Sequence, residues 1–262
     1  MKYQFLFLYY IFISVSICLA VSCKKPPQEN IEPPEPKPVP TSVIDIDSNE
    51  YAVTQFGNTL WMAENLRVTR YDTEALRSGD TIAEAKDNQA IDVEKPYYKD
   101  GRNFIESPQT DNLTGEIRNS IGYLYNWSAA AGTVTNSSTV RDSIQGICPN
   151  GWRLPRSKDW DSLFYYLGGI SVSGEKLKAK HGWYTASGSG SNASGMNCYP
   201  AGLAGGNFIS FMGQQTMYWG TETHIIFNAR AQVLRLFYSQ DEAALLYINK
   251  IQANSVRCVK DL

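Results

Sequence analysis

Residues 148–169 decide the helical part of the fold, and they read CPNGWRLPRSKDWDSLFYYLGG. Large apolar side chains recur there with helical spacing, at Trp160, Leu163, Phe164 and Leu167. Ser157 can cap a helix that begins at Lys158, and Asp159 lies near the positive end of that helix. The pair Gly168-Gly169 ends the pattern. The spacing therefore predicts a helix over 158–167 whose apolar face packs on strands.

Two hairpins precede this helix in the sequence. Residues 43–53 alternate apolar and polar side chains around a polar turn at 47–49. Residues 54–62 repeat the alternation around Gly57-Asn58, a dipeptide that favours tight hairpin turns. We therefore expect antiparallel strands at the beginning of the domain.

The segment between the hairpins and the helix is less regular. Residues 63–71 are expected to continue as a strand or an extended loop. Residues 72–118 are polar and are expected to form a long loop or a short helical insertion. Aromatic and other apolar side chains near helical spacing predict a second helix over 121–131, which Gly132 would end.

Short aromatic strands are expected after the 158–167 helix, separated by loops rich in Gly and Ser. The expected strands span 207–212, 216–221, 224–239 and 244–258, and the Gly-rich loops lie at 187–195 and 202–206. No repeat of fixed period is present. The sequence predicts an α+β fold in which two helices pack on twisted, mostly antiparallel strands with long loops.

The composition argues against a nucleic-acid partner. The 262 residues include 24 Lys and Arg against 26 Asp and Glu, which gives a net charge of −2. A protein that contacts many phosphates usually carries a basic surplus or a basic stripe. Only 2 His are present, so His-based catalysis and His-rich metal sites have little support.

The N-terminus is typical of an exported lipoprotein. Residues 1–22 combine a Lys at position 2 with an apolar run and then small residues, which predicts a signal peptide. Leu19 to Cys23 is similar to a bacterial lipobox, so Cys23 is the predicted lipidation site. The alternative is an uncleaved membrane anchor over 3–21. We expect attachment to the outer membrane by lipid, on its periplasmic or cell-surface side.

The segment that follows the lipidation site is a predicted spacer. Residues 23–42 are rich in Pro and in charged side chains, and they hold too few large apolar residues to build a core. An extended polyproline II linker is expected. The chain is thus predicted to comprise a signal over 1–22, a linker over 23–42 and one domain over 43–262, with an insertion at about 72–118.

Three cysteines remain once Cys18 leaves with the signal and Cys23 carries lipid: Cys148, Cys198 and Cys258. An exported protein meets an oxidising compartment, so one pair should form and one thiol should be left over. Spacing alone leaves three pairings open. No Cys-x-x-Cys motif is present, so a zinc knuckle or a thioredoxin-like redox site has no support.

Five blocks of sequence, in order, resemble the Fibrobacter succinogenes major paralogous domain family. The blocks are 56–67, 122–127, 148–155 with the following Trp160, 194–202, and 255–261. Together they cover about residues 43–262, with 72–118 outside the pattern. The family occurs in surface lipoproteins of Bacteroidetes and their relatives, which agrees with the separate prediction of a lipid anchor.

The resemblance also implies a fold and a disulfide. Residues 153–160 and 256–258 look like segments of formylglycine-generating (sulfatase-modifying) enzymes, which have a C-type lectin-like fold. This similarity implies that fold here, with the two chain ends in one sheet. It favours a bridge between Cys148 and Cys258, because both lie inside matched blocks. Cys198 is then expected to be a free, buried thiol.

The function expected first is non-catalytic binding or adhesion, with a glycan or a protein as the ligand. Variable loops on a stable core suit recognition. Candidate contact residues in and near the Gly-rich loops are Tyr184, Asn192, Asn207 and Phe208. The tryptophans Trp61, Trp152, Trp160 and Trp219 are expected to pack in the core instead.

Two alternatives of different class stay open. The first is a structural accessory subunit of an envelope complex, which fits the linker and the lipid equally well. The second is an enzyme related to the formylglycine-generating group. Such an enzyme needs reactive thiols in a cleft, whereas here Cys148 and Cys258 are expected to be structural and Cys198 stands alone. No catalytic residue, cofactor or metal ligand is predicted. Residues 45–49 carry only part of a calcium-loop pattern and are expected to form a hairpin turn.

Overall fold

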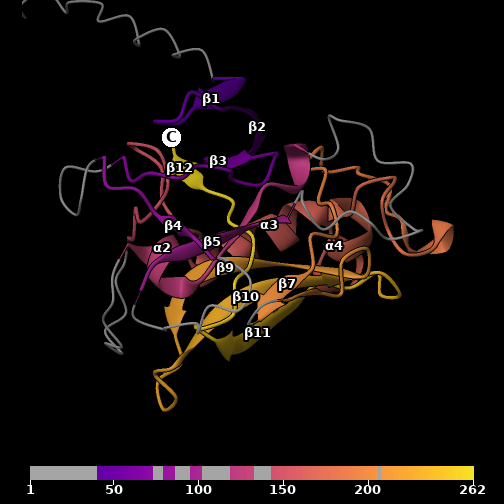
Figure 1. Cartoon of the computed structure of the whole chain (residues 1–262). Helices are drawn as coiled ribbons and strands as arrows, with labels where there is room; N and C mark the ends of the chain where they lie inside the picture. The colour runs from indigo at the N-terminus through magenta and orange to yellow at the C-terminus, as the bar shows by residue number, and fades with distance from the viewer. Residues whose placement is uncertain (1–39, 73–78, 86–94, 102–118, 133–142, 206–207) are drawn as a thin grey trace, which may run out of the picture. The chain divides into compact units, whose positions relative to one another are not determined.

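Figure 1 shows the computed structural model of the chain, which describes residues 40–72, 79–85, 95–101, 119–132, 143–205 and 208–262. These residues belong to the unit Val39–Leu262, which is distinct from the unit Met1–Pro38. The disulfide and the hydrophobic clusters given below lie in the larger unit, so it holds the contacts of an independently folding domain. The predicted signal 1–22, Cys23 and residues 23–39 of the predicted linker lie outside the described residues.

The described elements are mostly strands. In chain order the strands are β1 (Ser42–Ile44), β2 (Glu50–Phe56), β3 (Thr59–Met62), β4 (Ala83–Glu84), β5 (Tyr97–Asp100), β6 (Tyr123–Tyr125), β7 (Leu203–Gly205), β8 (Phe208–Ser210), β9 (Gln215–Thr223), β10 (Arg230–Phe237), β11 (Ala244–Asn249) and β12 (Val259–Asp261). The helices are α2 (Trp127–Ala131), α3 (Ser157–Leu167), α4 (Ile170–Leu177) and the 3-10 helix η2 (Ala186–Gly188). The domain is therefore α+β, as predicted.

Both ends of the described unit meet in one sheet. Its strand order is β1-β2-β3-β12, and each neighbouring pair is antiparallel. A second antiparallel sheet has the order β11-β10-β9. A third has the order β4-β5-β6, in which β4 and β5 run parallel, and β7 pairs with β8. Mostly antiparallel pairing was predicted, and the shared sheet of the chain ends agrees with the family resemblance.

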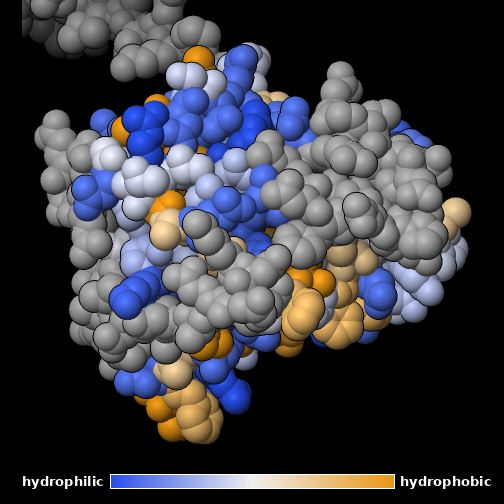
Figure 2. Space-filling view, in the orientation of Figure 1, coloured by the Kyte–Doolittle hydropathy of each residue, from blue (hydrophilic) through white to orange (hydrophobic). Residues whose placement is uncertain are grey.

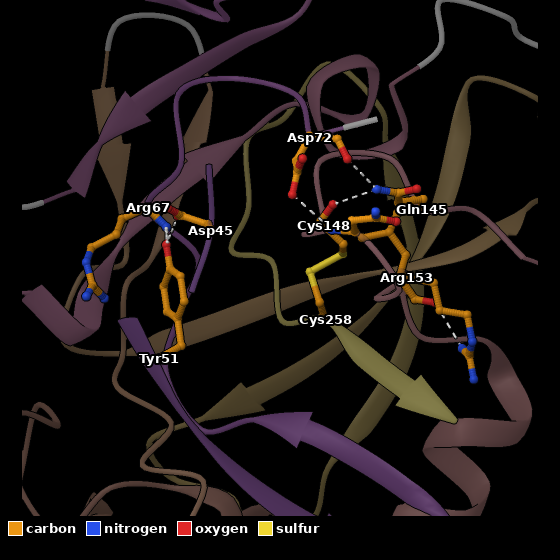
Figure 3. Close-up of a disulfide and its surroundings, with 10 residues drawn as sticks. Asp45, Tyr51, Arg67, Asp72, Gln145, Cys148, Arg153 and Cys258 are labelled. Atoms are coloured by element: carbon orange, nitrogen blue, oxygen red, sulfur yellow. Dashed lines mark hydrogen bonds between the residues drawn. A yellow bond between two sulfur atoms is a disulfide. The ribbon is translucent and has the colours of Figure 1, made fainter. Parts of the chain in front are cut away.

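The two predicted N-terminal hairpins are confirmed. The turn between β1 and β2 is built on Asp45, whose carboxylate accepts the backbone N–H groups of Asp47 and Asn49, each at 2.9 Å. The Tyr51 hydroxyl donates to the same carboxylate at 2.6 Å (Figure 3). Gly57, with φ of 58°, makes the turn between β2 and β3. Residues 45–49 therefore form a hairpin turn, as expected.

Helix α3 confirms the predicted helix, but its cap differs by one residue. Arg156 rather than Ser157 is the N-cap, because the Asp159 carboxylate accepts the Arg156 backbone N–H at 2.7 Å. Ser157 is the first helical residue, and its hydroxyl donates to Gln232 at 3.0 Å. Gly168 ends the helix in the left-handed region with φ of 91°, as predicted.

The predicted helix over 121–131 is wrong in its first half. Ile121 ends a preceding helical turn, Tyr123–Tyr125 form strand β6, paired with β5, and the chain is helical again over Trp127–Ala131. Gly122 has a positive φ of 65°, which separates the strand from what precedes it. The Asn126 side chain then caps α2 by accepting the Ala129 N–H. A new helix start at Asn126 therefore overrides the helical spacing of the aromatic residues.

Other expected elements also differ from the structure, among them the strand over 244–258, which ends at Asn249 as β11. The part of 72–118 that the structure describes contains strands β4 and β5, not only loop or helix. Residues Ile170–Leu177 form α4, which was not predicted. The expected strand over 224–239 begins only at Arg230, because the preceding residues form the turn between β9 and β10. Residues 63–71 carry no named strand and are extended loop.

The core consists of separate hydrophobic clusters. One cluster contains Trp152, Trp219 and the disulfide cysteines, and another packs Trp61 of β3 against Trp160 and the other buried residues of α3. The Trp61 and Trp160 rings lie 4.8 Å apart between centroids. All four tryptophans predicted to be core residues are buried. In the part of the chain that the structure describes, no helix has the length and apolar character needed to span a membrane.

Candidate functional site

The disulfide joins Cys148 to Cys258, which is the pairing that the family resemblance favoured. It lies in the main hydrophobic cluster and ties the segment before α3 to the residue before β12 (Figure 3). Cys198 is free and buried, as expected. Burial raises the pKa of the Cys198 thiol above its ordinary value, so the reactive thiolate form is disfavoured.

A polar hollow of about 360 Å³ lies beside the disulfide. Its lining residues are Ser143, Gln145, Asn150, Gly151, Trp152, Arg153, Lys260 and Asp261. The amide of Gln145, one of these lining residues, donates to the backbone oxygens of Asp72 at 2.7 Å and Cys148 at 3.2 Å (Figure 3). The Asn150 N–H donates to the Asp72 carboxylate at 3.1 Å. These groups satisfy one another and hold the loop around Cys148.

An ionic cluster closes one side of this hollow. The Arg153 guanidinium contacts Asp159 and Asp261, each at 2.6 Å, and Arg156 contacts the same two carboxylates. Burial alone would raise the pKa of Asp159, but hydrogen bonds from Arg153 and Arg156 bring it below its ordinary value. Hydrogen bonds from Arg153 also lower the pKa of Asp261. Two ionised, arginine-bound carboxylates fasten α3 to β12 and are poorly suited to donate protons.

A second buried cation joins three of the sequence blocks. The Arg257 guanidinium donates to the Asn65 side chain at 2.9 Å and to the backbone oxygens of Met196 and Asn197. The Asn65 amide in turn donates to the Ile121 carbonyl at 3.0 Å and to the Ser255 hydroxyl. The matched residues therefore meet at a structural junction in the core.

The predicted contact residues divide into two groups. Phe208 and Tyr184 are exposed, with 73% and 42% of their surface accessible. The Tyr184 N–H donates to the Gly213 carbonyl at 2.7 Å, and β8, which carries Phe208, leads into that same turn. Asn192 is half-buried in its own turn, where its amide contacts the Asn197 side chain at 2.7 Å. Asn207 lies outside the described residues.

Sequence reasoning missed an exposed aromatic residue in the turn that the Tyr184 N–H contacts. Phe211 has 52% of its surface accessible and a positive φ of 59°, so it belongs to a turn. The expected strand over 207–212 concealed that turn. Tyr238 also contributes, because its ring lies 5.4 Å from the Tyr184 ring in an edge-on contact. We call Tyr184, Phe208, Phe211 and Tyr238 the aromatic loop surface.

Comparison with family models identifies the chain. The model of the Fibrobacter succinogenes major domain matches residues 54–260. The chain belongs to this family, as the five blocks had indicated. No curated protein and no solved structure gives a significant match.

Proposed function

We propose that this protein is a non-catalytic binding or adhesion domain, held at the outer membrane by a lipid on Cys23, whose ligand is a glycan or a protein. The domain would face the periplasm or the cell surface. The observation that carries the proposal is the aromatic loop surface, in which Tyr184, Phe211 and, on β8, Phe208 are exposed. Aromatic rings supply contact area at little cost in side-chain entropy, and Tyr184 adds a hydroxyl that can hydrogen-bond a ligand.

The framework of these loops supports the proposal. Backbone hydrogen bonds tie the turn at Gly213 to Tyr184 and to Pro200. The Tyr238 N–H donates to the Gln214 carbonyl at 2.8 Å, which joins the end of β10 to the same turn. Ordered loops bind without first losing backbone freedom, so the surface is pre-organised.

The chemistry of the buried groups favours a binding role over an enzymatic one. Of the cysteines in the described domain, two form a disulfide and the third is a buried thiol. The close carboxylates Asp159 and Asp261 are held by Arg153. The shared sheet of the chain ends further supports our proposal that the fold is C-type lectin-like.

The test is a glycan and extracellular-matrix array probed with residues 39–262, with calcium and with a chelator. Phe208→Ala and Tyr184→Ala should each lower binding to any ligand found by roughly tenfold or more. Tyr165→Ala removes an exposed ring from α3 and is the matched control, which should bind like the parent.

Two outcomes would contradict the proposal. Binding that survives both loop substitutions would place the ligand elsewhere on the domain. An array without any ligand, together with envelope proteins that co-purify with the full chain, would favour the structural accessory subunit.

A further inference from the structure

The turn between β9 and β10 exposes three consecutive large apolar side chains. Ile225, Ile226 and Phe227 have 80%, 74% and 55% of their surface accessible. We call these three residues the hairpin tip. Figure 2 shows orange side chains at the lower end of the molecule, where Figure 1 places the turn that follows β9. None of the three belongs to a core cluster among the described residues.

Hydrogen bonds hold the hairpin tip in its turn. The His224 ring nitrogen Nδ1 accepts the backbone N–H groups of Ile226 and Phe227, at 3.2 and 3.1 Å. The backbone closes the turn between His224 and Arg230, with an N–H to O distance of 3.0 Å. The backbone is thus satisfied within the turn itself, and the apolar side chains project outward from a fixed base.

Polar and aromatic groups surround the base of the tip. The Arg230 guanidinium lies 5.3 Å from the centroid of the Phe227 ring, and the His224 ring packs against Tyr247 at 4.9 Å. The Tyr247 hydroxyl donates to Glu222 at 3.1 Å. Arg230 is the one residue with a formal charge at neutral pH within 224–230. Apolar side chains suit the acyl-chain region of a bilayer, and a cation and an aromatic ring just behind them suit its headgroup region. The hairpin tip and its base have this order.

The size of the tip decides between a protein partner and a bilayer. A stable protein interface needs about 800 Å² from each partner, and three side chains supply much less. A bilayer needs no complementary shape, because each apolar side chain gains free energy simply by leaving water. Exposed apolar patches of this kind mark interaction sites.

We propose that the hairpin tip inserts into a lipid bilayer, with Ile225, Ile226 and Phe227 among the acyl chains and Arg230 at the level of the phosphates. The tip lies far from β1, where the described chain begins (Figure 1). Insertion is therefore a membrane contact separate from any anchor upstream of β1. It is also independent of ligand binding at the aromatic loop surface.

The test uses residues 39–262, which lack the predicted lipid site. Vesicles of equal parts phosphatidylethanolamine and phosphatidylglycerol are floated with the parent and with the triple variant Ile225→Ser, Ile226→Ser, Phe227→Ser. The parent should float with the vesicles, and the variant should lose roughly a hundredfold in partitioning. Phe208→Ser removes an equally exposed ring from β8 and should float like the parent.

A second readout separates insertion from adsorption by charge. Ile226→Trp adds a seventh tryptophan to the chain. On vesicle binding, the difference in emission between this variant and the parent should shift to the blue and be quenched by lipids that carry bromine on their acyl chains. A parent that does not float, or a triple variant that floats equally well, overturns the proposal. Self-association of the parent that the triple variant loses would assign the tip to a second copy and would overturn it too. Circular dichroism checks that each variant is folded.

Discussion

Two buried cations meet very different surroundings in this domain. The Arg257 guanidinium is hydrogen-bonded to Asn65, Met196 and Asn197 and lies 5.1 Å from the Tyr218 ring centroid. The Lys250 ammonium is buried without a hydrogen-bond partner among the described residues. The Trp127 ring, with its centroid 5.4 Å from the Lys250 Nζ, offers the ammonium a cation–π contact. Burial lowers the pKa of Lys250 to about 8.

Replacing Lys250 should stabilise the domain at neutral pH. An unfolded lysine has a pKa near 10.4, so between pH 8 and that value the unfolded chain binds a proton that the folded domain does not. The free energy of unfolding of the parent therefore rises with pH across this window, and below it the full cost of burying the charge remains. Lys250→Met should gain about 1–3 kcal/mol at pH 7 and lose this pH dependence.

Urea unfolding at pH values from 7 to about 11 measures the effect. Lys158→Met, at an exposed position on α3, is the control and should leave both stability and its pH dependence unchanged. A Lys250→Met variant that is less stable than the parent at pH 7 would show that the ammonium is well solvated after all.

For individual residues of the candidate site, exposure to solvent could be predicted only where neighbouring residues in the sequence determine it. Phe208 and Tyr184 follow or flank Gly-rich segments, and both are exposed. Asn192 has the same kind of neighbours, yet its amide closes a turn with Asn197. Which of two such roles a polar side chain takes depends on loop conformation, and a composition pattern does not contain that information.

At the scale of elements, ion pairs of Asp159 hold the N-terminus of α3 in place. Asp159 receives hydrogen bonds from the Arg156 backbone and from the side chains of Arg153 and Arg156. Arg153 also contacts Asp261 on β12, so one guanidinium joins the carboxylate at the helix start to the last strand. The helix and the four-stranded sheet should therefore loosen together.

Asp159→Asn should lower the free energy of unfolding by about 2–4 kcal/mol at pH 7, because Arg153 keeps only its exposed partner. The pKa of Asp159 is lowered in the folded domain. Its contribution is therefore present above about pH 4 and is lost as the pH falls through the lowered value. The variant should accordingly show a flatter acid dependence in denaturant unfolding. Asp161→Asn, exposed on the same helix, should behave like the parent.

The elements that could be predicted are those whose signal is local. The apolar stripe and the Gly pair define α3. Helix α4 contains Gly174, a poor helix former, but a side chain there would meet the Glu242 carbonyl at 2.5 Å. Strand β6 depends on pairing with β5, which comes from residues that showed no regular pattern. Tertiary contacts therefore determine that α4 is a helix and β6 a strand, and the periodicity of their side chains could not predict either element.

At the scale of the whole molecule, the disulfide closes a loop that contains α3, α4 and β7 to β11. The two cysteines are separated by 110 residues. Closing so long a loop removes much conformational freedom from the unfolded chain. The main hydrophobic cluster surrounds the bridge, so the folded domain needs no rearrangement to accommodate it.

The double variant Cys148→Ala, Cys258→Ala should lose about 5 kcal/mol of unfolding free energy in the chain-entropy account. Guanidinium unfolding of residues 39–262 measures it. Cys198→Ala is the matched control, since it removes a buried sulfur without opening the loop. Thiol titration of the denatured parent should find one reactive group, and three would contradict the bridge.

The closed loop also determines how the domain carries mechanical load. Tyr184, Phe208 and the hairpin tip all lie between Cys148 and Cys258 in the sequence. Consider a force applied between the N-terminus and a ligand held at one of these residues. The force reaches the disulfide first and is then shared by the two chain segments that connect the disulfide to that residue. The loop cannot then be drawn out to the full contour of its 110 residues, and only the chain before Cys148 extends freely. If the aromatic loop surface binds a ligand as proposed, the bridge limits how far that ligand can be pulled from the N-terminus by extension of the chain.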